Sequence, residues 1–247
     1  MCDMTTTRCY LFLSSILFTV FATPVVHADA SLASQIEQYL QQQSANKKAS
    51  KFSPEDIKIM TRAATDLNNA MPNPGLKVGT KAPDFQLPNA HGEIITLSSL
   101  LAKGPVIINF YRGAWCPFCN IELRSLSSYK DKFKEYGANI VSITPQQPDK
   151  SLVQSKKGKF PFDILSDLDS SVIKKYNLFF TLPDDLVKVY KKLGLNIESF
   201  NGKGRNELPI PGTYVVDKNG VIRAAFANTD YKKRMEPKAI IEALKKL

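Results

Sequence analysis

Apolar residues near the start of the chain recur at the spacing of α-helices. Over 31–71 they lie three or four positions apart, and a polar stretch over 44–51 divides the pattern in two. The motif Ser53-Pro54-Glu55-Asp56 has a serine cap, a first-turn proline and two acids, which is typical of a helix start. We expect two helices. The sequence leaves open whether they pack on the rest of the chain, mediate dimerisation or act as a spacer.

From residue 79 onward, short apolar runs alternate with helical patterns. The segments expected as strands or extended chain are 79–87, 92–97, 106–111, 138–144, 160–165, 212–217 and 221–227. The expected helices are 98–102, a long one after Cys119 that ends at Gly137, 149–157, 168–176, 183–193 and 236–247. An insertion loop is expected over 194–207, and Asn219-Gly220 predicts a tight turn. This order predicts an α/β fold whose sheet is covered by helices on both faces.

The stretch that carries the chemistry is 109–120, Asn-Phe-Tyr-Arg-Gly-Ala-Trp-Cys-Pro-Phe-Cys-Asn. A buried strand ends here, a short loop follows, and Cys116 and Cys119 then open a helix. The free amides and the dipole of a first helical turn stabilise anions, and the thiolate is the reactive form of cysteine. We therefore expect a cysteine with a lowered pKa beside a disulfide partner. A CxxC at this place fits the thioredoxin fold.

Residues 1–28 look like a secretory signal. Arg8 precedes an apolar run over 10–21, and Val26-His27-Ala28 fits a small-residue cleavage site. We expect an exported protein, periplasmic or secreted, with an uncleaved membrane anchor as the alternative. The net charge of +10 indicates a lysine-rich surface. We do not expect nucleic-acid binding, because the sequence has no basic stripe interleaved with aromatic residues.

Composition excludes other uses of the cysteine pair. The chain has four cysteines, and Cys2 and Cys9 fall in the expected signal, so a single pair remains and does not form a disulfide scaffold. A zinc site needs about four ligands, and the only histidine after residue 28 is His91. The same shortage argues against a Cys-His hydrolase. We expect neither a metal nor a cofactor.

From residue 78 to 247 the chain resembles the AhpC/TSA peroxiredoxins, in particular their thioredoxin-like relatives that carry a CxxC. The matching blocks, in the same order, are Ala82-Pro83-Asp84-Phe85, Gly104-Pro105 with the following strand, Phe110-Tyr111, Cys119 with Glu122-Leu123, and Tyr214-Val215-Val216-Asp217 with Gly220. The resemblance implies a thioredoxin-like domain over 76–247, and the two helices expected before it make 29–75 an N-terminal helical extension.

The resemblance also implies roles for individual residues. Cys119 occupies the position of the peroxidatic cysteine, and Cys116 that of a threonine that orients the peroxide. Arg112 stands where the family has a proline. The family places an arginine before the later core strand, and Pro211 stands there instead. This proline resembles the cis-proline that faces the cysteine pair in thioredoxins.

Three neighbours are candidates for supporting the pair. Arg112 is expected to lower a thiol pKa, with a solvated charge or a carboxylate partner as the alternative. Trp115 is expected to cover one side of the pair, with a plain packing role as the alternative. Glu122 lies on the next helical turn and could pair with Arg112 or Arg124 or stay on the surface.

Two kinds of enzyme and one binding protein remain open. A thiol-dependent peroxidase would reduce hydrogen peroxide or organic hydroperoxides, with Cys119 forming a sulfenic acid, Cys116 condensing with it, and a thioredoxin-like protein as reductant. An exported thiol–disulfide oxidoreductase would attack a partner's disulfide with Cys116 and release the product with Cys119. The third hypothesis is a redox-sensing or binding module with little turnover. A homodimer is compatible with each hypothesis.

Overall fold

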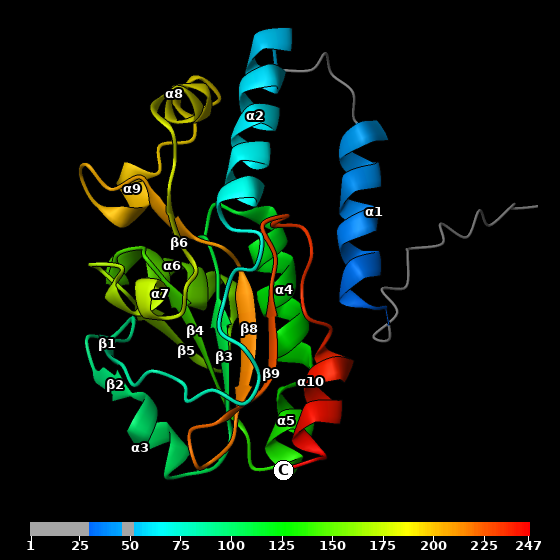
Figure 1. Ribbon diagram of the computed structural model, residues 1–247, viewed down its shortest axis with the longest axis vertical. Coiled ribbons are helices and arrows are strands. Elements are labelled where there is room, and N and C mark those ends of the chain that lie inside the picture. The colour runs from blue at the N-terminus through cyan, green and yellow to red at the C-terminus, as the bar shows by residue number, and fades with distance from the viewer. Residues whose placement is uncertain (1–29, 46–51) are drawn as a thin grey trace, which may run out of the picture. The chain divides into compact units, whose positions relative to one another are not determined.

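The computed structural model of the protein describes residues 30–45 and 52–247 (Figure 1). The expected signal sequence over 1–28, and with it Cys2 and Cys9, lies outside the described residues. Within the described part of the chain, no helix is long and apolar enough to cross a membrane.

Two helices precede the sheet, as the sequence predicted. They are α1 (Leu32–Ala45) and α2 (Pro54–Ala70). The expected cap of α2 is present, because Ser53 Oγ accepts a hydrogen bond from Asp56 N (3.2 Å) and the Asp56 carboxylate accepts one from Ser53 N (2.8 Å). The start of α2 is therefore fixed by its own local sequence.

The core of the fold is a five-stranded sheet with the strand order β5-β4-β3-β8-β9. Its strands are β3 (Val106–Phe110), β4 (Asn139–Thr144), β5 (Asp163–Ser166), β8 (Gly212–Val216) and β9 (Ile222–Ala227), and β1 (Gln86–Pro88) and β2 (Ile94–Thr96) form a separate hairpin. The central strand, β3, is parallel to β4, antiparallel to β8 and buried throughout. Phe110 lies opposite Gly212, so the chain leaving β3 runs beside the chain entering β8.

Helices cover both faces of this sheet, as predicted. The side chains of β3 alternate between two core clusters, with Val106, Ile108 and Phe110 in one and Ile107 in the other. The first cluster contains residues of α3 (Leu97–Leu101) and α7 (Ser171–Lys175), and the second contains residues of α4 (Pro117–Ser128), α5 (Lys130–Glu135) and α10 (Pro237–Leu244). Further helices are α6 (Pro148–Gly158), α8 (Asp184–Lys192) and α9 (Glu198–Asn201).

The structure differs from the prediction in two places. The long helix expected after Cys119 is divided at Tyr129 into α4 and α5. The segment 194–207, expected as a loop, contains α9 and leads into β7 (Glu207–Pro209), which pairs with β6 (Phe179–Thr181). Polar residues dominate this segment, but Ile197 and Leu208 are buried in a cluster with residues of α8. Their burial stabilises structure that the polar pattern hides.

The N-terminal helices pack on the rest of the domain. Leu32 and Ile36 of α1 are buried in a cluster with residues of α4, and α2 lies against α8. Glu236, just before α10, caps the start of α1, because its carboxylate accepts hydrogen bonds from Leu32 N (2.9 Å) and Ala33 N (2.8 Å). A carboxylate at this place satisfies free amides and is favoured by the helix dipole.

We predict that Glu236→Ala loosens α1 and lowers the free energy of unfolding by about 1 kcal/mol, because two backbone amides lose their acceptor. Hydrogen exchange of the α1 amides measures the loosening, and a denaturant titration measures the stability. Glu242→Ala, which removes an exposed carboxylate of α10, is the matched control. Unchanged exchange in α1 would show that packing alone holds this helix.

Candidate active site

The site is built where β3 ends and α4 begins. A loop over 111–115 carries the chain from the sheet to the helix, Cys116 is the N-cap residue of α4, and Cys119 lies in its first turn. Pro117 occupies the first helical position, where a backbone N–H has no intrahelical partner in any case. Both sulfurs therefore lie where the amides of a helix start favour negative charge.

The loop requires a glycine at position 113. The φ of Gly113 is 146°, which favours glycine, and a Cβ at this residue would lie 2.6 Å from the indole nitrogen of Trp115. The Trp115 ring therefore packs directly on the backbone of the loop, and any larger residue at 113 would displace it.

Amide side chains hold the same loop. Gln146 Oε1 accepts a hydrogen bond from Ala114 N (2.9 Å), and Asn120 Nδ2 donates to the carbonyls of Ala114 (2.7 Å) and Cys116 (2.9 Å). Gln154 Nε2 donates to Asn120 Oδ1 (2.9 Å). Sequence reasoning missed these residues, because single amides far apart in the chain carry no spacing signal.

Cys116 and Cys119 are free thiols, 1% and 0% exposed. Burial opposes ionisation of Cys116, but a hydrogen bond from Cys119 and the charges of Arg112 and Arg234 outweigh it and lower the pKa of Cys116 to about 6. Burial raises the pKa of Cys119 well above its usual range, and the hydrogen bond to Cys116 adds to the increase. The pair therefore shares one negative charge at neutral pH, held mainly on Cys116.

Arg112 lies beside the pair and is 5% exposed. Its Cζ lies 4.9 Å from the ring centroid of Trp115 and 4.6 Å from that of Tyr231, so the guanidinium is flanked by two aromatic rings. Its Nη2 donates to the Tyr190 hydroxyl (3.2 Å), while its Nε has no hydrogen-bond partner. Trp115 therefore contacts Arg112 as well as the cluster that contains both cysteines.

Arg234 is a second buried cation, and sequence reasoning missed it. Its side chain is 2% exposed, and its Nη2 lies 3.5 Å from Cys119 Sγ. Arg234 ends a run of three basic residues over 232–234, a pattern that normally indicates a solvated surface. The buried Met235 that follows is a weak sign that the chain turns inward here.

Glu122 is the partner of Arg234. An oxygen of its carboxylate lies 3.4 Å from Arg234 Nε, and the Glu122 side chain is 1% exposed. The expected pairing with Arg112 or Arg124 and the alternative of a surface position are both wrong, because the first turns of α4 face the core. Burial raises the pKa of Glu122 to about 7, although Arg234 acts to lower it. The carboxyl group can therefore gain or lose a proton near neutral pH.

Pro211 is buried beside the site, because it directly precedes Gly212, which pairs with Phe110 at the end of β3. The prediction of a cis-proline is wrong, because no peptide bond of the described residues is cis. The chain runs extended from β7 into β8, and Ile210 N donates to Leu178 O (2.7 Å) on the way. A cis-proline is usually found in a tight turn, and the chain makes no tight turn at the Ile210–Pro211 bond.

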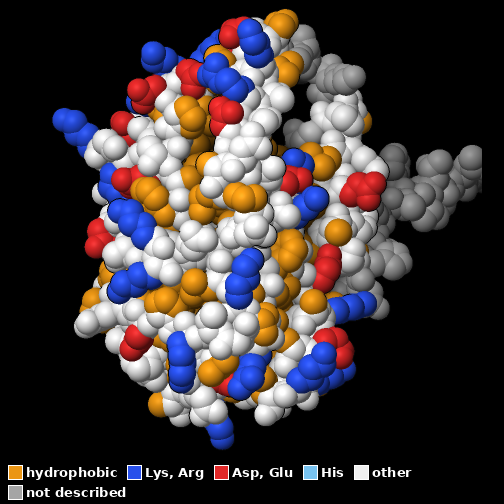
Figure 2. Space-filling view, viewed as in Figure 1, with side chains coloured by type: hydrophobic (Ala, Val, Ile, Leu, Met, Phe, Trp, Pro, Cys, Tyr) orange, Lys and Arg blue, Asp and Glu red, His pale blue; other side chains and the backbone are white. Residues whose placement is uncertain are grey.

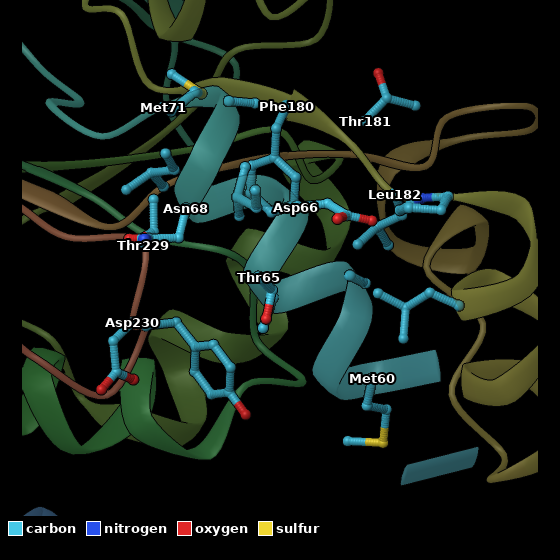
Figure 3. Close-up of a pocket in the computed structure, with 18 of the residues that line it drawn as sticks. Met60, Thr65, Asp66, Asn68, Met71, Phe180, Thr181, Leu182, Thr229 and Asp230 are labelled. Atoms are coloured by element: carbon cyan, nitrogen blue, oxygen red, sulfur yellow. The ribbon is translucent and has the colours of Figure 1, made fainter. Parts of the chain in front are cut away.

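A pocket of about 890 Å³ opens next to the site, between α2, β6 and the segment 229–232 (Figure 3). Arg112 and Pro211 are among its lining residues, so the pocket reaches the cation that faces the thiols. Figure 2 shows apolar side chains gathered beside α2 on this face, with charged side chains around them. No sequence pattern indicated a pocket here, because its walls come from segments far apart in the chain.

Comparison with known proteins identifies the family. The sequence of residues 78–225 matches the AhpC/TSA family. The chain belongs to this family. Both cysteines and Arg112 lie inside the matched region of the AhpC/TSA family, whereas α1, α2 and Arg234 lie outside it.

Curated relatives include the chloroplastic peroxiredoxin Q of Sedum lineare, which is 30% identical over 150 residues, covering 61% of this chain and 68% of that protein. The chloroplastic peroxiredoxin Q of Populus jackii is 29% identical, and the match covers 60% of its length. Thiol-disulfide oxidoreductase ResA of Bacillus thuringiensis subsp. konkukian is 25% identical over 175 residues, covering 70% of this chain and 79% of that protein. For the Populus protein, the match thus spans less than two thirds of its length.

Solved structures show the same fold. Peroxidoxin BcpB from Mycobacterium tuberculosis superposes with a TM-score of 0.56 at 22% identity, covering 70% of this chain and 98% of that one. Peroxiredoxin Q from Xanthomonas campestris gives a TM-score of 0.51 at 18% identity, with 69% and 96% covered. The predicted thioredoxin-like fold of the peroxiredoxin type is thereby confirmed.

We predict that the thiol pair loses its first proton with a midpoint near pH 6, so that alkylation by iodoacetamide falls as the pH falls through 6. Arg112→Gln and Arg234→Gln each raise this midpoint, because each arginine favours the thiolate. Thiolate absorbance at 240 nm gives an independent measurement. Arg124→Gln, at an exposed position of α4, is the matched control. A wild-type midpoint at the ordinary cysteine value of about 8.5 would contradict the prediction.

Proposed function

We propose that the protein is a thiol-dependent peroxidase that reduces hydrogen peroxide or organic hydroperoxides with Cys116 and Cys119. The observation that carries the proposal is a pair of free thiols at the start of α4 in a chain of the AhpC/TSA family, placed so that the hydrogen bond from Cys119 and two arginines lower the pKa of Cys116 to about 6 although burial opposes this. Similarity to the peroxiredoxin Q proteins supports the same chemistry.

Arg234 provides an arginine near Cys119, the group that the family pattern has and that this sequence lacks at the corresponding position. The resemblance implies an arginine near the peroxidatic cysteine, and Pro211 stands at its place in the chain. In space, the guanidinium of Arg234 lies 3.5 Å from Cys119 Sγ. A fixed cation here favours negative charge on the sulfur and on a peroxide oxygen that approaches it. This contact supports Cys119 as the attacking sulfur.

The cycle uses both sulfurs. As Cys119 attacks, its proton passes along the hydrogen bond to the Cys116 thiolate, the O–O bond breaks, and one oxygen is bonded to Cys119 as sulfenic acid. The other oxygen takes a proton from solvent and leaves as water or an alcohol. Cys116 then attacks the sulfenic acid, forming a disulfide and releasing water. An external dithiol of the thioredoxin type donates two electrons and restores both thiols by exchange.

Thiol–disulfide exchange with a partner protein is the second candidate. The lowered pKa of Cys116 and the similarity to ResA favour it. Burial argues against it, because sulfurs that are 1% and 0% exposed are more readily reached by a small peroxide than by a protein disulfide. A redox-sensing or binding module with little turnover is the third candidate.

Export and assembly are proposed on the sequence alone. The segment 1–28 would direct the chain to the periplasm or out of the cell, and mass spectrometry of the mature N-terminus tests this. A homodimer would fit a peroxidase of this kind, and sedimentation at several concentrations tests it.

We predict that Cys119→Ser lowers the single-turnover rate of hydrogen peroxide consumption at least about a thousandfold, because the attacking sulfur is lost. Cys116→Ser still attacks peroxide with Cys119, more slowly than the wild type because the thiolate that accepts the Cys119 proton is lost, and it stops at a sulfenic acid, which a dimedone label detects. Stopped-flow mixing of the reduced protein with peroxide measures the rate, and insulin reduction measures exchange with protein disulfides.

The outcomes of these two assays separate the three candidates. Peroxide reactivity that survives in Cys119→Ser and disappears in Cys116→Ser would reverse the roles of the two sulfurs. A wild type that ignores peroxide and rapidly reduces insulin would be an oxidoreductase. Inertness in both assays, with capture of a stable partner, would identify a binding module.

A further inference from the structure

The pocket beside Arg112 is much larger than a peroxidase needs for hydrogen peroxide. Its volume of about 890 Å³ falls within the range of sites for small organic molecules, roughly 300–1,000 Å³. One of its walls is α2, which lies outside the region that matches the AhpC/TSA family. The pocket is therefore a feature of this chain's own N-terminal extension.

Most of the pocket's lining is apolar, and Asp66 and several threonines are among its polar residues. The apolar part of the lining includes Met60 of α2, Met71 directly after α2, Phe180 of β6 and Leu182 directly after β6 (Figure 3). Thr229 Oγ1 donates to Asn68 Oδ1 (2.9 Å), which links α2 to the segment 229–232. Such a lining suits an elongated apolar body.

Arg112 is the one buried cation in the lining, and it has capacity for an anion. Its Nε has no hydrogen-bond partner, and although burial opposes its charge, the hydrogen bond to Tyr190 and the negative charge of the cysteine pair favour it. The other cation of the lining, Lys232, is paired with Asp230 at 2.7 Å. An anionic group entering this pocket would therefore be attracted to Arg112.

We propose that the pocket binds an amphipathic monoanion of the fatty-acid class, with its carboxylate on Arg112 and its hydrocarbon chain among the apolar residues along α2. The binding does not depend on the proposed peroxidase function. Its coupling to the redox state, described next, rests on that function's thiol–disulfide cycle.

Arg112 faces both the pocket and the sulfur pair, so the two sites share one counter-ion. In the reduced protein, the Cys116 thiolate already interacts with the charge of Arg112, and the thiolate repels a carboxylate bound nearby. In the disulfide form that charge is absent, and the carboxylate binds more tightly. The coupling is reciprocal, so the bound anion raises the pKa of Cys116.

Calorimetric titration with decanoate tests the site, with 1-decanol as an uncharged probe of the same length. Wild-type protein should bind decanoate, and Ala64→Trp, which fills the pocket from α2, should lose the binding at least about tenfold. Lys58→Trp, on the same helix outside the pocket, is the matched control. Arg112→Gln should remove the preference for decanoate over decanol.

The redox coupling is tested with the same titration on the disulfide and dithiol forms at pH 7.5. Decanoate should bind the disulfide form about fivefold or more tightly, and the double variant Cys116→Ser/Cys119→Ser should show no dependence on oxidant. Equal affinity of the two forms overturns the coupling.

Three results overturn the proposed site itself. The first is failure of the wild type to bind decanoate, and the second is undiminished binding by Ala64→Trp. The third is a wild-type dimer that dissociates in Ala64→Trp, because the pocket would then be occupied by a second copy of the chain. Because binding is measured without turnover, a protein that binds decanoate but consumes no peroxide would refute the proposed function and leave this site standing.

Discussion

One negative charge shared by two buried sulfurs is the constraint on which the rest of the structure depends. An ionised group in a dry interior is unfavourable unless opposite charges and hydrogen bonds compensate for it. Here the compensation comes from the first turn of α4, from Arg112 at the end of β3, and from Arg234 beyond β9. The fold brings these three parts of the chain to within reach of the two sulfur atoms.

The buried cations need compensation as well, and it extends outward from the sulfurs. Arg234 is paired with Glu122, whose carboxylate interacts in turn with Asn109 of β3 and Thr213 of β8. Burial raises the pKa of Glu122 to about 7 while Arg234 acts to lower it, so the charge of this carboxyl group depends on the cation beside it.

The sequence was sufficient for what is local. The Ser53 cap, the CxxC at a helix start and the order of strands and helices each depend on residues close together in the chain. Arg234 could not be found in this way, because 115 positions separate it from Cys119 and only the packed fold brings them together. Pro211 is likewise positioned between β7 and β8, whose pairing partners β6 and β3 come from other parts of the chain.

The helical extension takes part in the site although it lies outside the family match. Leu32 and Ile36 of α1 share a buried cluster with Cys116 and Cys119, and α2 forms a wall of the pocket that reaches Arg112. Burial is what makes the charge on the sulfur pair depend so strongly on its cations. The family domain therefore supplies the dithiol, while the extension helps to determine how dry its surroundings are and from which side small molecules approach Arg112.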